Sequence, residues 1–206
     1  MKIEVMYSDD YSKVQLSRLE KFSMLAGQEE KQVASVNMDI RNWEQNNASL
    51  LYLLLREKRF SKEKGGLFTL LYKDEVIAVS GFYQSDFNPE VYVFGCRSWV
   101  LKGHRLNLLI AEKLLPAQLV AIENLGGKAA IISFNESTKA FAKLIERSNK
   151  SIESTKKFFF GERYPDLYHD MILHQNPVFI KNSKQWILIK YLKSFKYDWK
   201  ELEIQI

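Results

Sequence analysis

The spacing of hydrophobic positions changes along this chain, and each spacing predicts a different element. Residues 2–7 alternate between apolar and polar side chains, which is typical of an edge strand. Residues 12–25 carry apolar side chains three or four positions apart, which predicts an amphipathic helix. Residues 28–47 are mostly polar, and we expect a loop and a short helix there. Asn47 then suits the N-cap of a helix over residues 48–58.

The middle of the chain shows strand spacing. Residues 67–72 and 76–83 are apolar runs separated by the polar segment 73–75, which predicts a β-hairpin. A longer strand is expected over residues 91–101. Gly95 lies in its middle and indicates a bulge, because glycine weakens a regular strand.

Helical spacing returns after this strand. It predicts a helix over residues 106–124, and Pro116 should kink or restart that helix. Residues 126–127 are both glycine and end the helix in the left-handed conformation. The continuous apolar run over residues 128–134 is typical of a buried parallel strand, and a second helix is expected over residues 137–147.

The pattern weakens after residue 148. Strands are expected over residues 156–161, 166–174 and 184–192, and the tail from residue 194 receives no assignment. We find no internal repeat and no flexible linker, so the prediction is a single domain over residues 1–206. Its parts are an N-terminal strand and helices (1–66), a core (67–147), and C-terminal strands with a tail (148–206).

Composition and charge narrow the class of protein. The chain is 46% apolar and 27% charged, as is ordinary for a folded soluble protein. The net charge of +5 is compatible with a phosphorylated ligand and does not by itself indicate nucleic acid. No apolar run approaches the ~18 residues that a membrane span needs. Asp9 and Asp10 stand where a signal peptide would be apolar, so we expect a cytoplasmic protein without membrane partners.

The cysteine and histidine content argues against a disulfide-bonded protein and against a metal-binding protein. Cys96 is the single cysteine, which excludes an internal disulfide and fits a reducing compartment. Its apolar surroundings favour a small buried hydrophobe over a nucleophile. The three histidines are too scattered to predict a metal site.

The turn at residues 101–105 (LKGHR) is the strongest candidate for a binding site. It joins the long strand to the predicted helix, whose first amides and dipole would point at the turn. Such a position suits a phosphate or pyrophosphate, with His104 and Arg105 as contacts to the anion.

Three stretches carry a resemblance to a known family. They are RSWV at 97–100 leading to HR at 104–105, LLPAQ at 114–118, and SFNE at 133–136. With the order of elements over residues 67–192, they resemble the GCN5-related N-acetyltransferase (GNAT) superfamily. The resemblance implies a mixed α/β fold, with a twisted mixed sheet and helices on both faces. It implies transfer of an acetyl or other short acyl group from coenzyme A to a primary amine by direct attack in a ternary complex.

The resemblance also implies a coenzyme site. In the family, the helix after the central strand binds the pyrophosphate, the splayed strand aligns the pantetheine arm, and an Asn after the next strand contacts the coenzyme. The positions carried over for acetyl-CoA or another acyl-CoA are Trp99, Val100, Arg105, Leu106, Asn107, Leu108, Leu109 and Asn135. The sequence departs from the family where Leu106, Leu108 and Ile110 replace small residues, and where the second helix lacks the usual Tyr.

Catalysis requires a base for the amine, a donor for the carbonyl and an acid for the thiolate. A backbone N–H of the bulge over residues 95–99 is a candidate donor. Glu90 and Tyr168 are the candidate base and acid, and the candidate contacts to a small-molecule or peptide amine are Tyr83, Asp86 and Arg97.

Several alternatives stay open at this point. Each of these residues also has a structural interpretation: Arg97 as an ion-pair partner, Asn135 as a helix cap, the others as surface or loop positions. An inactive binding or assembly module is the second hypothesis. A nucleic-acid-associated protein using the basic run over residues 56–64 and the aromatic tail from residue 194 is the third. The oligomeric state is open, with a homodimer among the alternatives.

Overall fold

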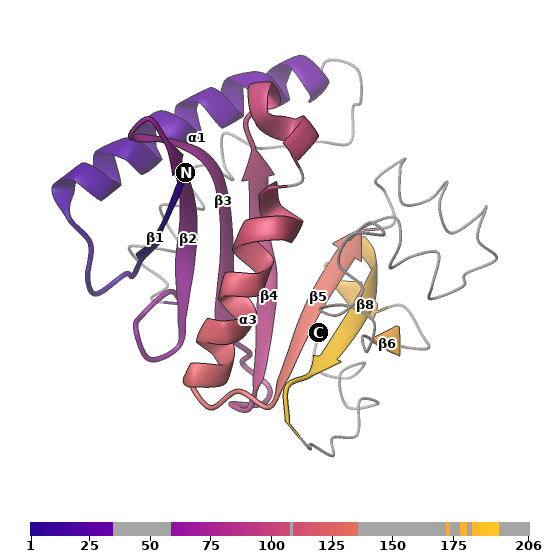
Figure 1. Cartoon of the computed structure of the whole chain (residues 1–206). Coiled ribbons are helices and arrows are strands. Elements are labelled where there is room, and N and C mark those ends of the chain that lie inside the picture. Colours follow the sequence, from indigo (N-terminus) through magenta and orange to yellow (C-terminus); the bar gives the residue numbers. More distant parts are fainter. Residues whose placement is uncertain (35–58, 108, 136–171, 174–177, 181–182, 194–206) are drawn as a thin grey trace. The chain divides into compact units, whose positions relative to one another are not determined.

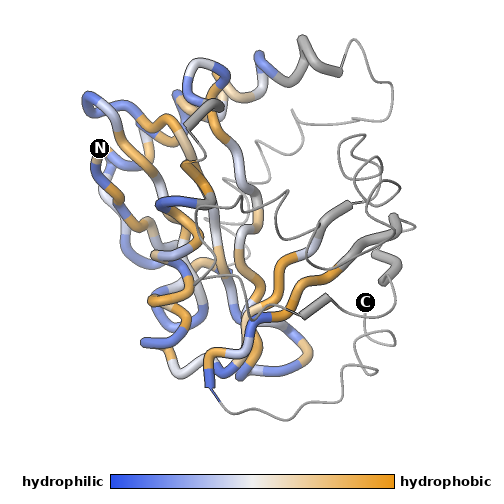
Figure 2. Tube along the Cα trace, turned by 45° about the vertical axis from the view of Figure 1, so that its right-hand side comes forward, coloured by the Kyte–Doolittle hydropathy of each residue, from blue (hydrophilic) through white to orange (hydrophobic). Residues whose placement is uncertain are grey.

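The computed structural model describes residues 1–34, 59–107, 109–135, 172–173, 178–180 and 183–193 (Figure 1). These residues belong to two compact units. Unit 1 contains residues 1–84 and 94–121, and unit 2 contains residues 85–93 and 122–206. The tube in Figure 2 is orange along much of the strands and blue at several of the connecting turns.

Unit 1 is built on antiparallel strands. Strand β1 (Lys2–Met6) pairs with β2 (Gly65–Tyr72), and β2 pairs with β3 (Glu75–Gln84). The two-residue turn Lys73-Asp74 joins β2 to β3, with φ of 49° and 63°. Two positive φ angles match the twist of a tight hairpin. The predicted first strand and hairpin are confirmed, with Glu75 as the first residue of β3 instead of part of the turn.

Helix α1 (Lys13–Ala34) packs on one face of these strands. It begins with a capping box, because the Ser12 hydroxyl accepts the Gln15 N–H at 3.1 Å and the Gln15 amide oxygen accepts the Ser12 N–H at 2.9 Å. The helix continues nine residues beyond the predicted end at residue 25. Of the residues 28–47, where a loop and a short helix were expected, residues 28–34 belong to α1 and the rest lie outside the described residues. Buried Ala26 extends the apolar face one turn past Phe22, so packing continues the helix.

A helical segment covers the other face of unit 1. Leu67 and Leu71 of β2 pack with α1, so Phe68 and Leu70 face the opposite side by strand alternation. Both are buried, at 4% and 1% exposure, and the segment after β4 contacts β2 and β3. Figure 1 shows this segment running along the sheet. The predicted mixed α/β fold, with helices on both faces of its sheet, is confirmed.

The helix predicted over residues 106–124, with a kink or restart at Pro116, is corrected in its first half. A 3₁₀-helix η1 (Lys102–Asn107) comes first, then a π-helical turn η2 (Ile110–Leu114), and α-helix α3 (Leu115–Asn124) follows. The Leu115 N–H bonds to the Ile110 carbonyl, five residues back. Pro116 has no N–H, and its ring crowds the preceding turn, which accounts for a widened turn there.

Unit 2 contains the start of strand β4 (Val91–Val100) and the strands that follow. Residues 91–93 of β4 pair in parallel with β5 (Ala129–Asn135), as predicted for that run, and β5 pairs antiparallel with β8 (Ser183–Tyr191). Strands β6 (Ile172–Leu173) and β7 (Val178–Ile180) both pair with β8. The apolar cluster of unit 2 consists of Val91, Ala129, Ile131, Ile187 and Ile189.

Other predictions have mixed outcomes. Gly126, at φ +83°, follows α3 as predicted. The strand over 184–192 is confirmed as β8, and β6 lies within the predicted strand 166–174. The helices over 48–58 and 137–147 and the strand over 156–161 lie outside the described residues. In the part of the chain that the structure describes, no helix is long and apolar enough to cross a membrane.

Candidate functional site

Strand β4 bends at Gly95, where the sequence indicated a bulge. The backbone there has φ +68°, in the left-handed region that favours glycine. The Gly95 N–H donates to the side-chain oxygen of Gln118 on α3 at 2.8 Å. The Gly95 carbonyl accepts the Ser98 hydroxyl at 2.7 Å. Side chains from two different elements therefore hold both polar groups of the bent residue.

A second hydroxyl extends this arrangement into the core. The hydroxyl oxygens of Ser80 and Ser98 lie 2.7 Å apart. Because the Ser98 proton goes to the Gly95 carbonyl, Ser80 is the donor to Ser98. Ser80 and Gln118 are both fully buried, at 0% exposure. We call Gly95, Ser98, Ser80 and Gln118 the β4 clamp.

The clamp lies where β4 loses one of its partners. The parallel register between β4 and β5 consists of three pairs and ends at Val93 opposite Ile131, although β4 continues to Val100. From Phe94 onward β4 belongs to unit 1. In the described residues, the β4 edge beyond Val93 therefore has no ladder to β5. An extended ligand can pair with such an edge through main-chain hydrogen bonds.

Three hydrogen bonds hold the basic turn after β4 (residues 101–105) in place. The Leu101 N–H bonds to the Ile77 carbonyl at 3.0 Å, and the His104 N–H bonds to the Leu101 carbonyl at 2.8 Å. The Lys102 N–H donates to a carboxylate oxygen of Glu29 on α1 at 2.7 Å. The amides of Lys102 and His104 in η1 therefore already have partners within the chain. The expected α-helix N-terminus at Leu106 was wrong, since η1 begins at Lys102.

Most of the predicted coenzyme contacts lie in this region of unit 1. Trp99 is half-buried and packs against the α1 cluster, and Val100 ends β4. Leu109 is buried, at 2% exposure, so its side chain is directed into the core. The backbone of Arg105, Leu106 and Asn107 lies in η1, while the positions of their side chains are not described. Leu108 lies outside the described residues, and Asn135 ends β5 in unit 2.

The predicted catalytic and acceptor residues are more dispersed. The Glu90 carboxylate pairs with the Lys128 ammonium in unit 2, just before β4. Asp86 lies in the loop that precedes it. Tyr83 is the last but one residue of β3, and the central carbon of the Arg59 guanidinium lies 5.0 Å from its ring centroid. Arg97 lies in β4 with its side chain not described, and Tyr168 lies outside the described residues. These assignments stay predictions.

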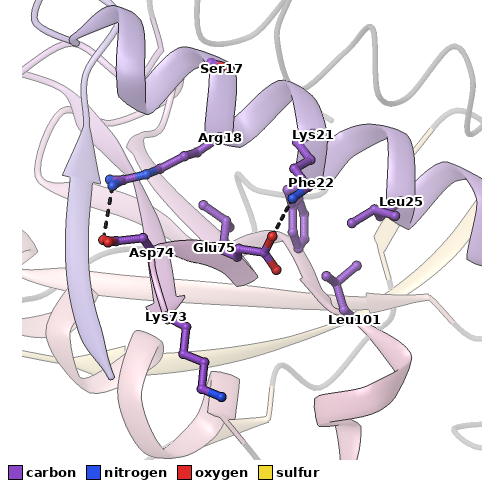
Figure 3. Close-up of a pocket in the computed structure, with 10 residues that line it drawn as sticks. Ser17, Arg18, Lys21, Phe22, Leu25, Lys73, Asp74, Glu75 and Leu101 are labelled. Carbon is purple, nitrogen blue, oxygen red and sulfur yellow. Dashed lines mark hydrogen bonds and ion pairs between the residues drawn. The ribbon is translucent and has the colours of Figure 1, made fainter.

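A cavity of about 260 Å³ lies between α1 and the hairpin turn (Figure 3). Phe22, Leu25, Val76 and Leu101 contribute its apolar surface, and charged side chains surround it. Arg18 pairs with Asp74 at 3.1 Å, and Lys21 pairs with Glu75. The pKa of Glu75 is lowered by its hydrogen bond to Lys21. These two ion pairs link α1 to the hairpin turn across the cavity.

Sequence reasoning missed the partners that fix the strand and the turn. Gln118 was noticed only as part of the LLPAQ stretch, and Glu29 lay in a stretch expected to hold a loop and a short helix. A polar residue at the buried face of an apolar helix is the signal that identifies Gln118, because such a side chain needs a hydrogen-bond partner. In the described part of the chain, no group of three or more His, Cys, Asp or Glu side chains could hold a metal ion.

No protein-family model and no curated protein matches this sequence. Solved structures do match it over nearly its whole length. The PaiA N-acetyltransferase from Thermoplasma acidophilum, solved in complex with coenzyme A, aligns with 93% of this chain and 99% of its own, at 10% identity and a TM-score of 0.54. A GNAT-family acetyltransferase from Staphylococcus aureus Mu50 aligns with 93% and 100%, at 12% identity and 0.53. An acyl-CoA N-acyltransferase from Pseudomonas aeruginosa aligns with 92% and 98%, at 9% identity and 0.51.

These likenesses show the fold. The chain has the acyl-CoA N-acyltransferase fold, as the resemblance in its sequence implied. Fold alone does not give activity, because function depends on the residues of the site.

Proposed function

We propose that this protein is an acyl-CoA-dependent N-acyltransferase that moves an acetyl or other short acyl group to a primary amine. The carrying observation is the end of the β4–β5 register at Val93, followed at once by the left-handed Gly95. A strand that leaves its neighbour and bends offers main-chain groups to an extended ligand. The pantetheine arm of coenzyme A is such a ligand.

The coenzyme would follow β4 toward its carboxyl end. Its pantetheine amides would pair with the β4 edge beyond Gly95, and its pyrophosphate would lie against the backbone between Arg105 and Ile110, where η1 passes into η2. Arg105 would supply the cationic contact. The buried position of Leu109 supports this placement, because at that residue the bulky side chain is directed away from the turn.

The reaction needs no group beyond positioned polar contacts. The amine nitrogen attacks the thioester carbonyl carbon, the carbon–sulfur bond breaks, and the thiolate leaves with the proton that the amine loses. Glu90 and Tyr168 are the proposed base and acid. The ion pair of Glu90 with Lys128 assigns this carboxylate a structural partner as well, so its replacement tests both roles.

Calorimetric titration with acetyl-CoA tests the proposal. The natural chain should bind it, and Arg105→Ala should weaken binding by about tenfold to a hundredfold, the value of a hydrogen-bonded ion pair. Lys113→Ala is the matched control, since Lys113 is an exposed cation of η2 that the proposal does not use. Absence of binding at millimolar acetyl-CoA would contradict the proposal.

Transfer is measured separately, as release of the coenzyme A thiol with polyamines, amino acids and lysine peptides as acceptors. Binding of acetyl-CoA without release to any acceptor class would favour the inactive module. Retention on a polyanion that weakens steeply with salt would instead favour the nucleic-acid hypothesis.

A further inference from the structure

We infer that Gln118 is a positioning residue, which with Ser98 holds the bend of β4 in the shape that recognises the acyl thioester. The inference rests on the proposed function and concerns one part of it, the preference for the acylated coenzyme over free coenzyme A. Neither side chain was predicted for the site, and both contact the backbone of Gly95 directly.

The clamp fixes a residue that would otherwise be free to change conformation. Glycine populates positive and negative φ about equally, so a glycine bend does not hold its own shape. Here the Gly95 N–H is held at 2.8 Å and its carbonyl at 2.7 Å, by side chains from α3 and from β4 itself. Release of either contact lets the peptide units beside Gly95 rotate without moving the rest of the strand.

The direction of these bonds bears on the donor for the thioester carbonyl. The Gly95 N–H already donates to Gln118, so it is not the amide that meets the substrate. A donor from this bend must come from the neighbouring peptide units. A hydrogen-bond donor stabilises developing charge only when it is oriented in advance. The clamp supplies that orientation, because it sets the plane of both peptides that flank the bend.

Burial separates this role from simple stabilisation. Gln118 is fully buried, and its side-chain nitrogen has no hydrogen-bond partner among the described residues. A buried donor without a partner is unfavourable, so Gln118 is a poor choice for stability alone. Replacing it with methionine removes the acceptor and the unpartnered donor together and keeps a similar volume. The free energy of unfolding should then change little, although the bend at Gly95 loses one of its two contacts.

The test compares two ligands that differ only at the acyl group. Acetyl-CoA reaches the bend with its thioester carbonyl, whereas coenzyme A shares every other contact. We therefore expect Gln118→Met to reduce the ratio of acetyl-CoA affinity to coenzyme A affinity by about threefold to tenfold, the value of one neutral hydrogen bond. Ser98→Ala should reduce the ratio in the same direction. Gln118→Glu keeps an acceptor oxygen at the same place, so its affinity ratio should stay close to that of the natural chain.

Thr69→Val is the matched control. The buried Thr69 hydroxyl donates to the Glu4 carbonyl at 3.3 Å, so this variant also loses one side-chain hydrogen bond in unit 1, between β1 and β2. Its affinity ratio should equal that of the natural chain. Hydrogen exchange of the Gly95 amide, followed by NMR in protein labelled with ¹⁵N-glycine, should be faster in Gln118→Met and unchanged in Thr69→Val.

The outcomes separate the two claims. If the natural chain binds neither ligand, the proposed function fails and the inference fails with it. If the natural chain binds both, and the ratio is unchanged in Gln118→Met and in Ser98→Ala, the inference alone is overturned. Should Gln118→Met not fold, Ser98→Ala decides the matter, since Ser98 is exposed and its hydroxyl holds the other side of the same residue.

Discussion

Replacement of Gly95 by alanine tests the bend in β4 without any ligand. The left-handed region costs an L-residue about 1–2 kcal/mol per residue. Gly95 lies there, at φ +68°, so alanine must either accept this strain or straighten the strand and lose the contacts with Gln118 and Ser98. Alanine also restricts the unfolded chain, which stabilises by about 0.4–1 kcal/mol where the backbone permits it.

Gly103→Ala measures the effect of alanine on the unfolded chain without the strain. Gly103 is not among the residues with positive φ, and a Cβ placed on it would meet no atom within 4 Å. Gly103→Ala should therefore show the gain from the unfolded chain alone. The difference between the two variants then equals the strain, about 1–2 kcal/mol in the free energy of unfolding.

Urea unfolding followed by circular dichroism measures this difference. With a slope of about 2 kcal/mol per molar urea, the midpoint of Gly95→Ala should lie roughly 0.5–1 M below that of Gly103→Ala. The slopes of the two variants should agree, since neither change alters the surface exposed on unfolding. Equal midpoints would show that Gly95 does not occupy the left-handed region, and the structural basis of the clamp would be lost.

Three further substitutions test other contacts. Gly65→Ala would place a Cβ 2.3 and 2.6 Å from two main-chain carbonyl oxygens, so we expect loss of soluble protein or of more than about 3 kcal/mol in unfolding free energy, measured by expression yield and urea titration. Lys21 lowers the pKa of Glu75, so the natural chain should lose stability as the pH falls below the usual Glu value of 4.5. Glu75→Gln should remove this loss, and identical curves of stability against pH for the two proteins would contradict the prediction. Lys128→Met removes the partner that holds the Glu90 carboxylate. If Glu90 is the base, the rate of transfer should change, and an unchanged rate would mark the pair as structural only.

The elements predicted correctly are those that local chemistry determines. The hairpin follows from two apolar runs around a polar turn, and Gly126 follows α3 because glycine accepts the left-handed conformation. The bend at Gly95 was predictable for the same reason. In each case the local sequence indicates where the backbone turns before any tertiary contact forms.

The predictions that failed depend on contacts distant in the sequence. Helix α1 continues past residue 25 because Ala26 packs in the core of unit 1, and Glu29 reaches the amide of Lys102, 73 residues away. Helical periodicity does not distinguish 3₁₀, π and α geometry, so the divided segment after β4 was read as one helix. Pro116 correctly indicated a break, although the widened turn precedes it.

The turn after β4 and the bend at Gly95 should affect different parts of coenzyme binding. Small residues at a pyrophosphate turn let the backbone approach the phosphates, and this chain carries leucines and isoleucine there instead. The amides of Lys102 and His104, moreover, have partners within the protein. Affinity for the nucleotide half of the coenzyme should therefore be modest and depend strongly on Arg105. The bend of β4, by contrast, is held from both sides. In the proposed function, discrimination at the acyl end would therefore not depend on how tightly the phosphates bind. Weak binding of the coenzyme would then be compatible with selective recognition of its acylated form, because separate parts of unit 1 would govern the two properties.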